Sequence, residues 1–438
     1  MEFAVGVLIL AVGLVVSIAL HEIGHLVPAK KFGVKVPQYM VGFGPTLWSR
    51  TIRGTEYGVK ALPLGGYVRM VGMYPPGRGV VAPRSRRDGR PTLVEEARQA
   101  ALEEIGPGEE HRAFYRLTVP RKLVVMLGGP VMNLLIAAVF MAVIVVGIGL
   151  PQYTSTLGAV QECVPADSSQ SDCAAADPAS PGAEAGLRPG DEIVRWGSVE
   201  VSGWEDISGA IADGGSGATT VVVDRDGERL TLQVTPQLTE RPVVDAAGDA
   251  VVDANGRPRL EERPFVGIGP SFDLVRQPIT TVPGLVWDTF TGTVEVVLTL
   301  PQRLVDVAQA AFGTEERDPG VVGLVGVGRF AGEIASVDGE GYGLAERSAD
   351  MMSLLVSLNM ALFVFNLIPL LPLDGGHIAG ALWEGTRRKV ARLRERPDPG
   401  PVDTARLLPL TYGVVAVLLG MSVLLAYADI VNPLSLTG

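Results

Sequence analysis

The sequence predicts a polytopic α-helical membrane protein with four transmembrane helices, one inserted extracytoplasmic domain and a cytoplasmic membrane-associated β-hairpin region. Two features of the composition predict this class. The 438-residue chain is 47% hydrophobic with a mean hydropathy of +0.29, more apolar than an ordinary soluble protein. Charged residues make up 19% of it, too many for a protein that lies wholly in the bilayer. The formal net charge of −11 argues against a nucleic-acid partner.

The first apolar run, residues 1–28, ends in the HExxH motif that spans His21 to His25. On a helix this spacing places the two histidines one turn apart on one face, where both rings can hold a single zinc ion. Glu22, beside the first ring, can take a proton from an attacking water. A helix could contain this pattern by chance, but three ionisable groups inside an apolar span normally mark a function.

Residues 29–122 are polar, with about twice as many basic as acidic residues, which indicates the cytoplasmic side. Between 41 and 69, apolar and polar residues alternate between glycine turns, a pattern typical of short β-hairpins. Two interpretations stay open for this region. It is either a solvated loop or an edge strand at the membrane that pairs with an extended peptide near Gly66.

The second apolar span covers residues 123–150. Gly128, Gly129 and Pro130 lie near its start, and small residues of this kind allow helices to approach closely. Asn133 follows them, and we interpret it as a packing residue.

Residues 151–270 form an acidic, water-soluble segment long enough for a domain. Its predicted order is a strand at 157–160, a turn, a strand, a helix at 207–211 and a hairpin. This order, with the run AGL-x-PGD-x-I from Ala185 to Ile193, resembles a PDZ domain of the bacterial protease type. Such a domain binds an extended peptide by strand addition, here presented by Leu157, Gly158 and Val160. The domain could instead exclude bulky substrates, and the two roles are compatible.

The two cysteines, Cys163 and Cys173, lie in an insertion just before the PGD run. In an extracytoplasmic domain we expect a disulfide between them. The domain contains no histidine, which argues against a zinc site there.

Residues 271–349 are expected to be an amphipathic segment on the membrane surface. A helical pattern runs from Pro283 to Ala311, but charged residues interrupt it and Pro301 is expected to break it.

The third apolar span, residues 350–376, ends in the run from Asn366 to His377, NLIPLLPLDGGH. Prolines and glycines cannot continue a regular helix, so we expect the backbone to unwind around Asp374. A carboxylate at membrane depth requires a cation, and the HExxH motif lacks a third ligand.

The basic run that follows marks residues 377–406 as a cytoplasmic loop. Residues 407–428 are the fourth span, and 429–438 an extracytoplasmic tail. With both termini outside, the first and third spans run inward. The HExxH motif and the run around Asp374 then lie at the same depth, near the cytoplasmic leaflet of the inner membrane. Neither motif by itself requires this agreement, so it supports a shared metal site.

Together these motifs resemble the site-2 protease family, peptidase family M50, of intramembrane zinc metallopeptidases. The resemblance is closest to the actinobacterial members that cleave anti-sigma factors. It is weakest at residues 74–108 and 241–264. The motifs that carry it are HEIGH at 21–25, GFG at 42–44, PLGGYV at 63–68, GGP-x-x-N at 128–133 and N-x-x-P-x-x-x-x-DG at 366–375.

The resemblance implies that His21, His25 and Asp374 hold one zinc ion, with Glu22 as the general base and later the proton donor. Asn366 would bind the substrate backbone or the oxyanion, or else form an interhelical hydrogen bond. The implied role of His377 is structural, and we expect His111 to lie on the surface.

The implied substrates are single-span membrane proteins, such as anti-sigma factors after a first cut by a site-1-type protease. Two rival functions stay open: a protease of signal-peptide remnants, and a non-hydrolytic PDZ scaffold or transporter with a structural metal. The presence of Glu22 argues against the second, because a structural site has no use for a carboxylate beside its ligands.

Overall fold

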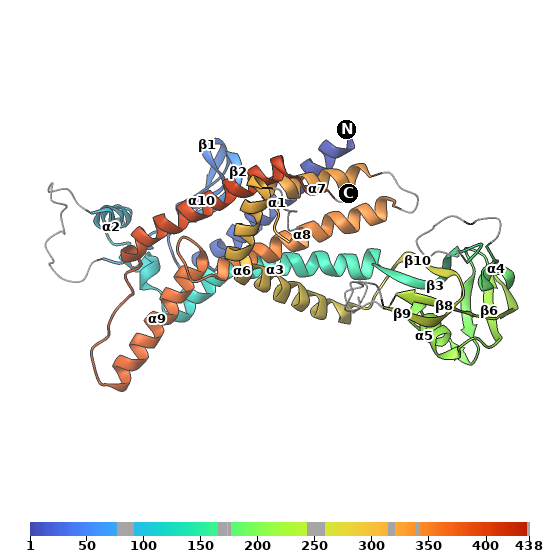
Figure 1. Cartoon of the computed structure of the whole chain (residues 1–438). Coiled ribbons are helices and arrows are strands. Elements are labelled where there is room, and N and C mark those ends of the chain that lie inside the picture. Colours follow the sequence, from blue (N-terminus) through green and yellow to red (C-terminus); the bar gives the residue numbers. More distant parts are fainter. Residues whose placement is uncertain are drawn as a thin grey trace. The chain divides into compact units, whose positions relative to one another are not determined.

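A computed structural model describes the chain except for residues 77–91, 165–172, 174–176, 243–258, 314–319, 338–341 and 436–438. It divides into two compact units. One unit joins Met1–Ile148 to Gln277–Gly438, and the other is Gly149–Arg276. The first is largely helical and the second is built around β-strands (Figure 1).

Four helices among the described residues are long and apolar enough to cross a membrane, the number predicted. They are α1 (Glu2–Lys31), α3 (Val119–Ala142, continued to Ile148 by the π-helix η3), α8 (Leu344–Leu367) and α10 (Leu408–Val431, preceded by η5, Thr404–Leu407).

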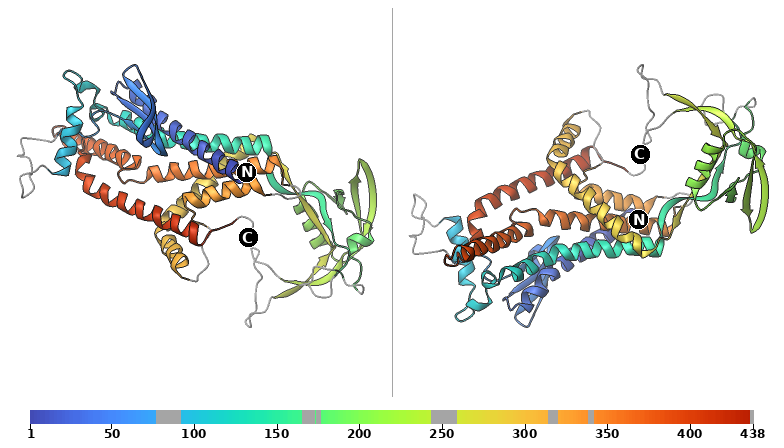
Figure 2. Two further views of the ribbon diagram at one scale, coloured as in Figure 1. Left: turned by 90° about the horizontal axis from the view of Figure 1, so that it is seen from above. Right: turned by 90° about the horizontal axis from the view of Figure 1, so that it is seen from below.

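Helices α1, α3 and α8 run side by side in the first unit (Figure 2). Helices α1 and α3 meet at Gly24 and Gly128, where a Cβ atom on either glycine would collide with the backbone of the other helix. This contact of small residues brings the HExxH turn of α1 against α3.

The predicted amphipathic segment at 271–349 differs from the structure in two ways. The second unit extends past residue 270, because β10 (Ile268–Val275) pairs with β3 (Leu150–Val160). The segment also contains two helices, α6 (Val282–Phe312) and α7 (Leu324–Ser336), and the first turns of α8.

The prediction that Pro301 breaks the helix is wrong, since α6 continues through it. Proline removes one backbone hydrogen bond, but the turns on either side keep theirs. Val307 and Ala311, beyond the proline, are buried against Leu425 and Ala428 of α10, and this packing holds the second half of α6 in place.

The connection predicted at 377–406 contains a helix in its first half, α9 (Asp374–Leu393). The predicted unwound segment lies directly before Asp374, at residues 368–373. Gly375 and Gly376 allow the first turn of α9 to pack directly on this segment, because a Cβ atom on either would collide with its backbone.

The region predicted to hold short hairpins on the cytoplasmic side forms one long hairpin, β1 (Gln38–Ile52) and β2 (Thr55–Arg69), and a short helix, α2 (Leu93–Glu103). Residues 38–41 pair with 56–59 on one side and with 66–69 on the other. The stretch 66–69 is therefore an edge strand, and no other strand of the described chain pairs with it.

The second unit contains the predicted strand, turn, strand, helix and hairpin, as β3, α4 (Pro181–Glu184), β4 (Glu192–Trp196), α5 (Trp204–Gly214), β6 (Thr219–Arg225) and β7 (Glu228–Val234). The strand order is β10-β3-β4-β6-β7, and the short β5 (Val199–Glu200) pairs with β4. A separate pair, β8 (Gln237–Pro242) and β9 (Leu260–Phe265), precedes β10.

Asp191 of the PGD turn is buried, and the hydrogen bonds that it accepts explain why an aspartate stands at this position of the motif. It accepts hydrogen bonds from the backbone N–H of Arg188 at 2.8 Å and from Nε of Arg225 at 2.6 Å. Burial alone would raise the pKa of Asp191, but these two donors hold it below its ordinary value. The turn is thereby fixed to β6.

The prediction that Leu157, Gly158 and Val160 present a free strand edge is wrong. Leu157 is only 1% exposed, and its N–H and C=O bond to the 190–191 turn. A side chain at Gly158 would collide with Pro270, and Val160 pairs with Ile268 of β10. The edge of the sheet on this side is β10, and we predicted the groove from residues 157–160 without it.

Cys163 and Cys173 form the expected disulfide, with their Cα atoms 5.8 Å apart.

Candidate metal centre

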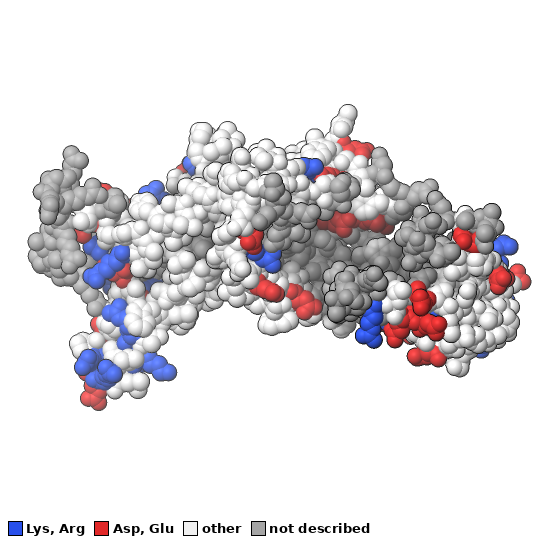
Figure 3. Space-filling view, viewed as in Figure 1, with Lys and Arg blue, Asp and Glu red and all other residues white. Residues whose placement is uncertain are grey.

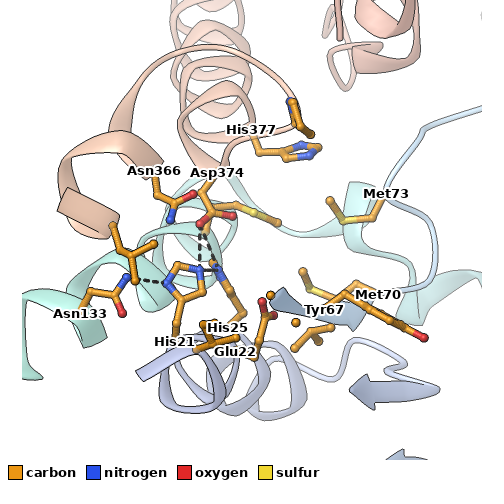
Figure 4. Close-up of a pocket in the computed structure, with 17 residues that line it drawn as sticks. His21, Glu22, His25, Tyr67, Met70, Met73, Asn133, Asn366, Asp374 and His377 are labelled. Atoms are coloured by element: carbon orange, nitrogen blue, oxygen red, sulfur yellow. Dashed lines mark hydrogen bonds and ion pairs between the residues drawn. The ribbon is translucent and has the colours of Figure 1, made fainter. Parts of the chain in front are cut away.

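The structure brings the two predicted metal motifs together at one point (Figure 4). His21 and His25 lie one turn apart on α1, and Asp374 is the first residue of α9. The carboxylate Oδ2 of Asp374 lies 3.3 Å from Nε2 of His21 and 3.2 Å from Nε2 of His25. The two Nε2 atoms lie 3.2 Å apart.

These distances fit a tetrahedral zinc ion. Ligand atoms about 2.1 Å from such an ion lie about 3.4 Å from one another, close to the three separations observed. Two imidazole nitrogens and one carboxylate oxygen are also a ligand set that zinc prefers, and three protein ligands leave the fourth position open for catalysis.

The other ring nitrogens of the two histidines are held by α3. Nδ1 of His25 lies 2.8 Å from the carbonyl oxygen of Val125, so it carries the proton and Nε2 presents a lone pair. Nδ1 of His21 lies 3.0 Å from the side-chain amide of Asn133. Oδ1 of that amide is buried without a partner. With the amide turned over, Oδ1 accepts the proton of His21 Nδ1 and satisfies both groups.

The interpretation of Asn133 as a packing residue is therefore wrong, since its amide orients a candidate ligand. The available signal was an amide inside an apolar span, which requires a polar partner wherever it is buried. Sequence spacing alone could not identify that partner.

Lone pairs from three residues thus converge on one buried point. Oδ2 of Asp374 is buried and receives no hydrogen bond. With the Nδ1 protons engaged by α3, no hydrogen lies between the three ligand atoms, and only a cation makes this arrangement favourable.

Gly129 of α3 leaves the space that the ion needs. A Cβ atom at this position would lie against Nε2 of both His21 and His25, where a bound metal would be. From the sequence we predicted only that Gly129 allows close helix packing. In the structure it also leaves room for the metal.

Gly129→Ala is expected to remove most of the bound zinc and the cleavage activity without altering any ligand, because the new methyl group occupies the metal position. Gly147→Ala is the matched control, since a Cβ atom there meets only one contact, at 4.0 Å. Metal analysis of both purified variants tests this. Wild-type zinc content in Gly129→Ala would show that the ion lies elsewhere.

Glu22, Gly66 and Asn366 line one cavity of about 390 Å³ with the metal ligands. The carboxylate of Glu22 points into this cavity, beside the strand that carries Tyr67 (Figure 4). Gly66 of the hairpin edge lies so close that a Cβ atom on it would be 3.0 Å from Cγ of Glu22. His377 lines the cavity as well, and it is outside the three-residue metal group. His111 is exposed, as predicted.

Comparison with known proteins agrees with this site. The family model "Peptidase family M50" matches residues 9–396. The chain is 34% identical to "Zinc metalloprotease Rip1" of Mycobacterium tuberculosis over 445 residues, which cover 100% of both chains. It is 33% identical to "Zinc metalloprotease Rip1" of Mycolicibacterium smegmatis, also over 100% of both. It is 27% identical to "Metalloprotease MmpA" of Caulobacter vibrioides over 89% of each chain. The chain is therefore a zinc metalloprotease of peptidase family M50, the site-2 protease family that its motifs predicted.

Proposed function

We propose that this chain is an intramembrane endopeptidase that hydrolyses peptide bonds within or next to the transmembrane segments of single-span proteins. One observation carries the proposal. The metal group and Glu22 lie between the apolar helix α1 and the segment that directly follows the apolar helix α8, so the reaction would take place at membrane depth.

In this proposal His21, His25 and Asp374 hold zinc, and Glu22 takes the proton of the attacking water and passes it to the leaving amine. When bound, zinc supplies a Lewis acid that polarises the scissile carbonyl and acidifies water. Val125 and Asn133 fix the orientation of the two rings.

Asn366 would bind the substrate backbone or the developing oxyanion. Its position on the cavity wall supports this role. The alternative was an interhelical hydrogen bond, and the side chain of Asn366 makes none with the described part of the chain.

The hairpin edge would hold the substrate in an extended form. A transmembrane helix hides its amides in its own hydrogen bonds, so it must unwind before hydrolysis. Residues 66–68 combine an unpaired strand edge with a place on the wall of the catalytic cavity, which supports strand addition there.

The proposed substrates are anti-sigma factors that an upstream protease has already cut, with signal-peptide remnants as the alternative. Comparing the membrane proteomes of cells that carry wild-type or Glu22→Gln protein would identify the accumulating proteins. Accumulation of signal-peptide remnants alone would favour the alternative.

We infer that both termini and the second unit are extracytoplasmic. The Cys163–Cys173 disulfide supports this, because such bonds persist in oxidising compartments. A membrane-impermeant thiol reagent is expected to label these cysteines in intact cells only after mild reduction. Labelling that requires broken membranes would reverse the orientation.

We propose that the second unit is a PDZ-type domain that excludes substrates with bulky extracytoplasmic parts. Its element order and PGD turn support the PDZ assignment. The pairing of residues 157–160 with β10 on one side, and the bonds of Leu157 to the 190–191 turn on the other, argue against peptide addition there.

The adjacent ends of this unit allow a sharp test, because Leu150 pairs with Val275 and a short linker can replace the whole domain. Its removal is expected to permit cleavage of untrimmed substrate. Insertion of an unrelated folded domain of equal size should restore exclusion and still allow cleavage of trimmed substrate. If the chain with the unrelated domain fails to cut trimmed substrate, the PDZ-type surface itself must recognise the substrate.

A further inference from the structure

A second cavity in the helical unit is unrelated to the metal centre and carries a concentration of positive charge. Its volume is about 780 Å³, and four arginines and two aspartates line it: Arg116, Arg387, Arg388, Arg406, Asp398 and Asp403. Lys and Arg side chains gather over this part of the molecule, around α9 (Figure 3).

Two of these arginines, Arg116 and Arg387, have N–H donors that are not taken up by the two aspartates of the cavity. Asp403 pairs with Arg98 at 2.7 Å and with Arg406 at 3.2 Å, while Asp398 forms an ion pair with Nε of Arg388 at 3.4 Å.

No carboxylate of the described chain pairs with Arg116 or Arg387. Arg387 donates to the carbonyl oxygen of Pro399 at 3.3 Å, and the guanidinium of Arg116 lies 5.5 Å from the centre of the Tyr115 ring. Guanidinium N–H donors that no described carboxylate takes up can bind the oxygens of a phosphate.

Hydrogen bonds to a buried glutamate hold part of the cavity wall in place. Glu384 of α9 is buried and accepts from Nζ of Lys122 at 2.7 Å, at the start of α3. Its Oε2 also accepts from the backbone N–H of Val402, at 3.2 Å, on the cavity wall. The cavity is therefore formed without a ligand, which lowers the cost of binding one.

Exposed apolar side chains follow the cavity residues along the chain. Arg406 lies in η5, whose last residue Leu407 is 45% exposed, and Leu410 in the first turn of α10 is 55% exposed. Trp383 is 58% exposed and lies one turn before Arg387 on the same face of α9. A charged pocket at the end of a membrane-spanning helix, beside exposed leucine and tryptophan, matches a ligand with an anionic head and an apolar tail.

We propose that this cavity binds the phosphate headgroup of an anionic membrane phospholipid. Free inorganic phosphate shares the headgroup chemistry but would leave the apolar surroundings without a partner. Because α9 begins at Asp374, a bound lipid would connect the helix that carries a candidate metal ligand to the segments that precede α3 and α10, which hold Arg116 and Arg406.

The test uses the purified full-length chain and two lipid probes in nanodiscs, phosphatidylglycerol and phosphatidylcholine. The double variant Arg116→Gln/Arg387→Gln is expected to bind phosphatidylglycerol at least about tenfold more weakly than wild type. The control is Arg394→Gln/Arg396→Gln, which removes the same charge from exposed positions outside the cavity and should bind within about twofold of wild type. Zinc content per chain reports folding, and Arg116→Lys/Arg387→Lys should retain most of the binding if the fold tolerates change there.

Equal losses in the cavity and control variants would overturn the proposal, because general surface charge would explain them. Equal binding of phosphatidylcholine and phosphatidylglycerol would overturn it as well. Displacement of phosphatidylglycerol by millimolar inorganic phosphate would assign the cavity to a soluble anion and exclude the lipid.

Discussion

Glu22→Gln is expected to keep its zinc and to lose cleavage activity by a factor of about 10²–10⁴, the usual contribution of a general base. Glutamine preserves the size and shape of the side chain in the cavity and cannot accept a proton. The three residues of the metal group are untouched, so the metal content should equal that of wild type. Metal analysis and a cleavage assay on the same preparation measure both quantities.

Glu2→Gln is the matched control, since it makes the same chemical change at an exposed position in the first turn of α1. It should cleave like wild type. Cleavage by Glu22→Gln within a few-fold of wild type would rule out Glu22 as the base, while loss of zinc would show that the carboxylate belongs to the metal site.

Asp374→Ala is expected to lower zinc affinity by well over 100-fold, with loss of cleavage. Second-shell changes typically cost 10–100-fold, and this change removes a ligand itself. Two histidines alone hold zinc weakly, and their Nε2 lone pairs would face each other without the carboxylate.

Asp288→Ala on α6 is an exposed control that should retain zinc and activity. Equilibrium titration with a competing chelator measures the affinity of each variant. Wild-type affinity in Asp374→Ala would contradict the ligand assignment and direct attention to His377, which lines the same cavity.

The residues of the metal centre could be predicted because local rules determine them. The HExxH spacing places His21 and His25 on one helix face wherever that helix packs. Prolines 369 and 372 end α8 and place Asp374 at the start of the next helix. Matching depth along two spans then brings the motifs together. Four apolar helices were predictable for the same reason, since hydropathy depends on composition within one segment.

What could not be predicted depends on contacts between distant segments. The partner of Asn133 and the space left by Gly129 exist only once α1 packs against α3. The pairing of β10 with β3 closes the strand edge that we expected to be free, across a separation of about one hundred residues. Pro301 was misread because the packing of α6 against α10 outweighs the one hydrogen bond that proline removes.

The most direct test of intramembrane hydrolysis at this centre is the position of the cut. A single-span substrate, trimmed on its extracytoplasmic side, is incubated with wild-type protein in proteoliposomes, and mass spectrometry identifies the new ends. The account predicts ends inside or next to the apolar segment, absent with Glu22→Gln or after zinc removal and restored when zinc returns. A cut confined to the soluble parts of the substrate, or one that persists with Glu22→Gln, would contradict it.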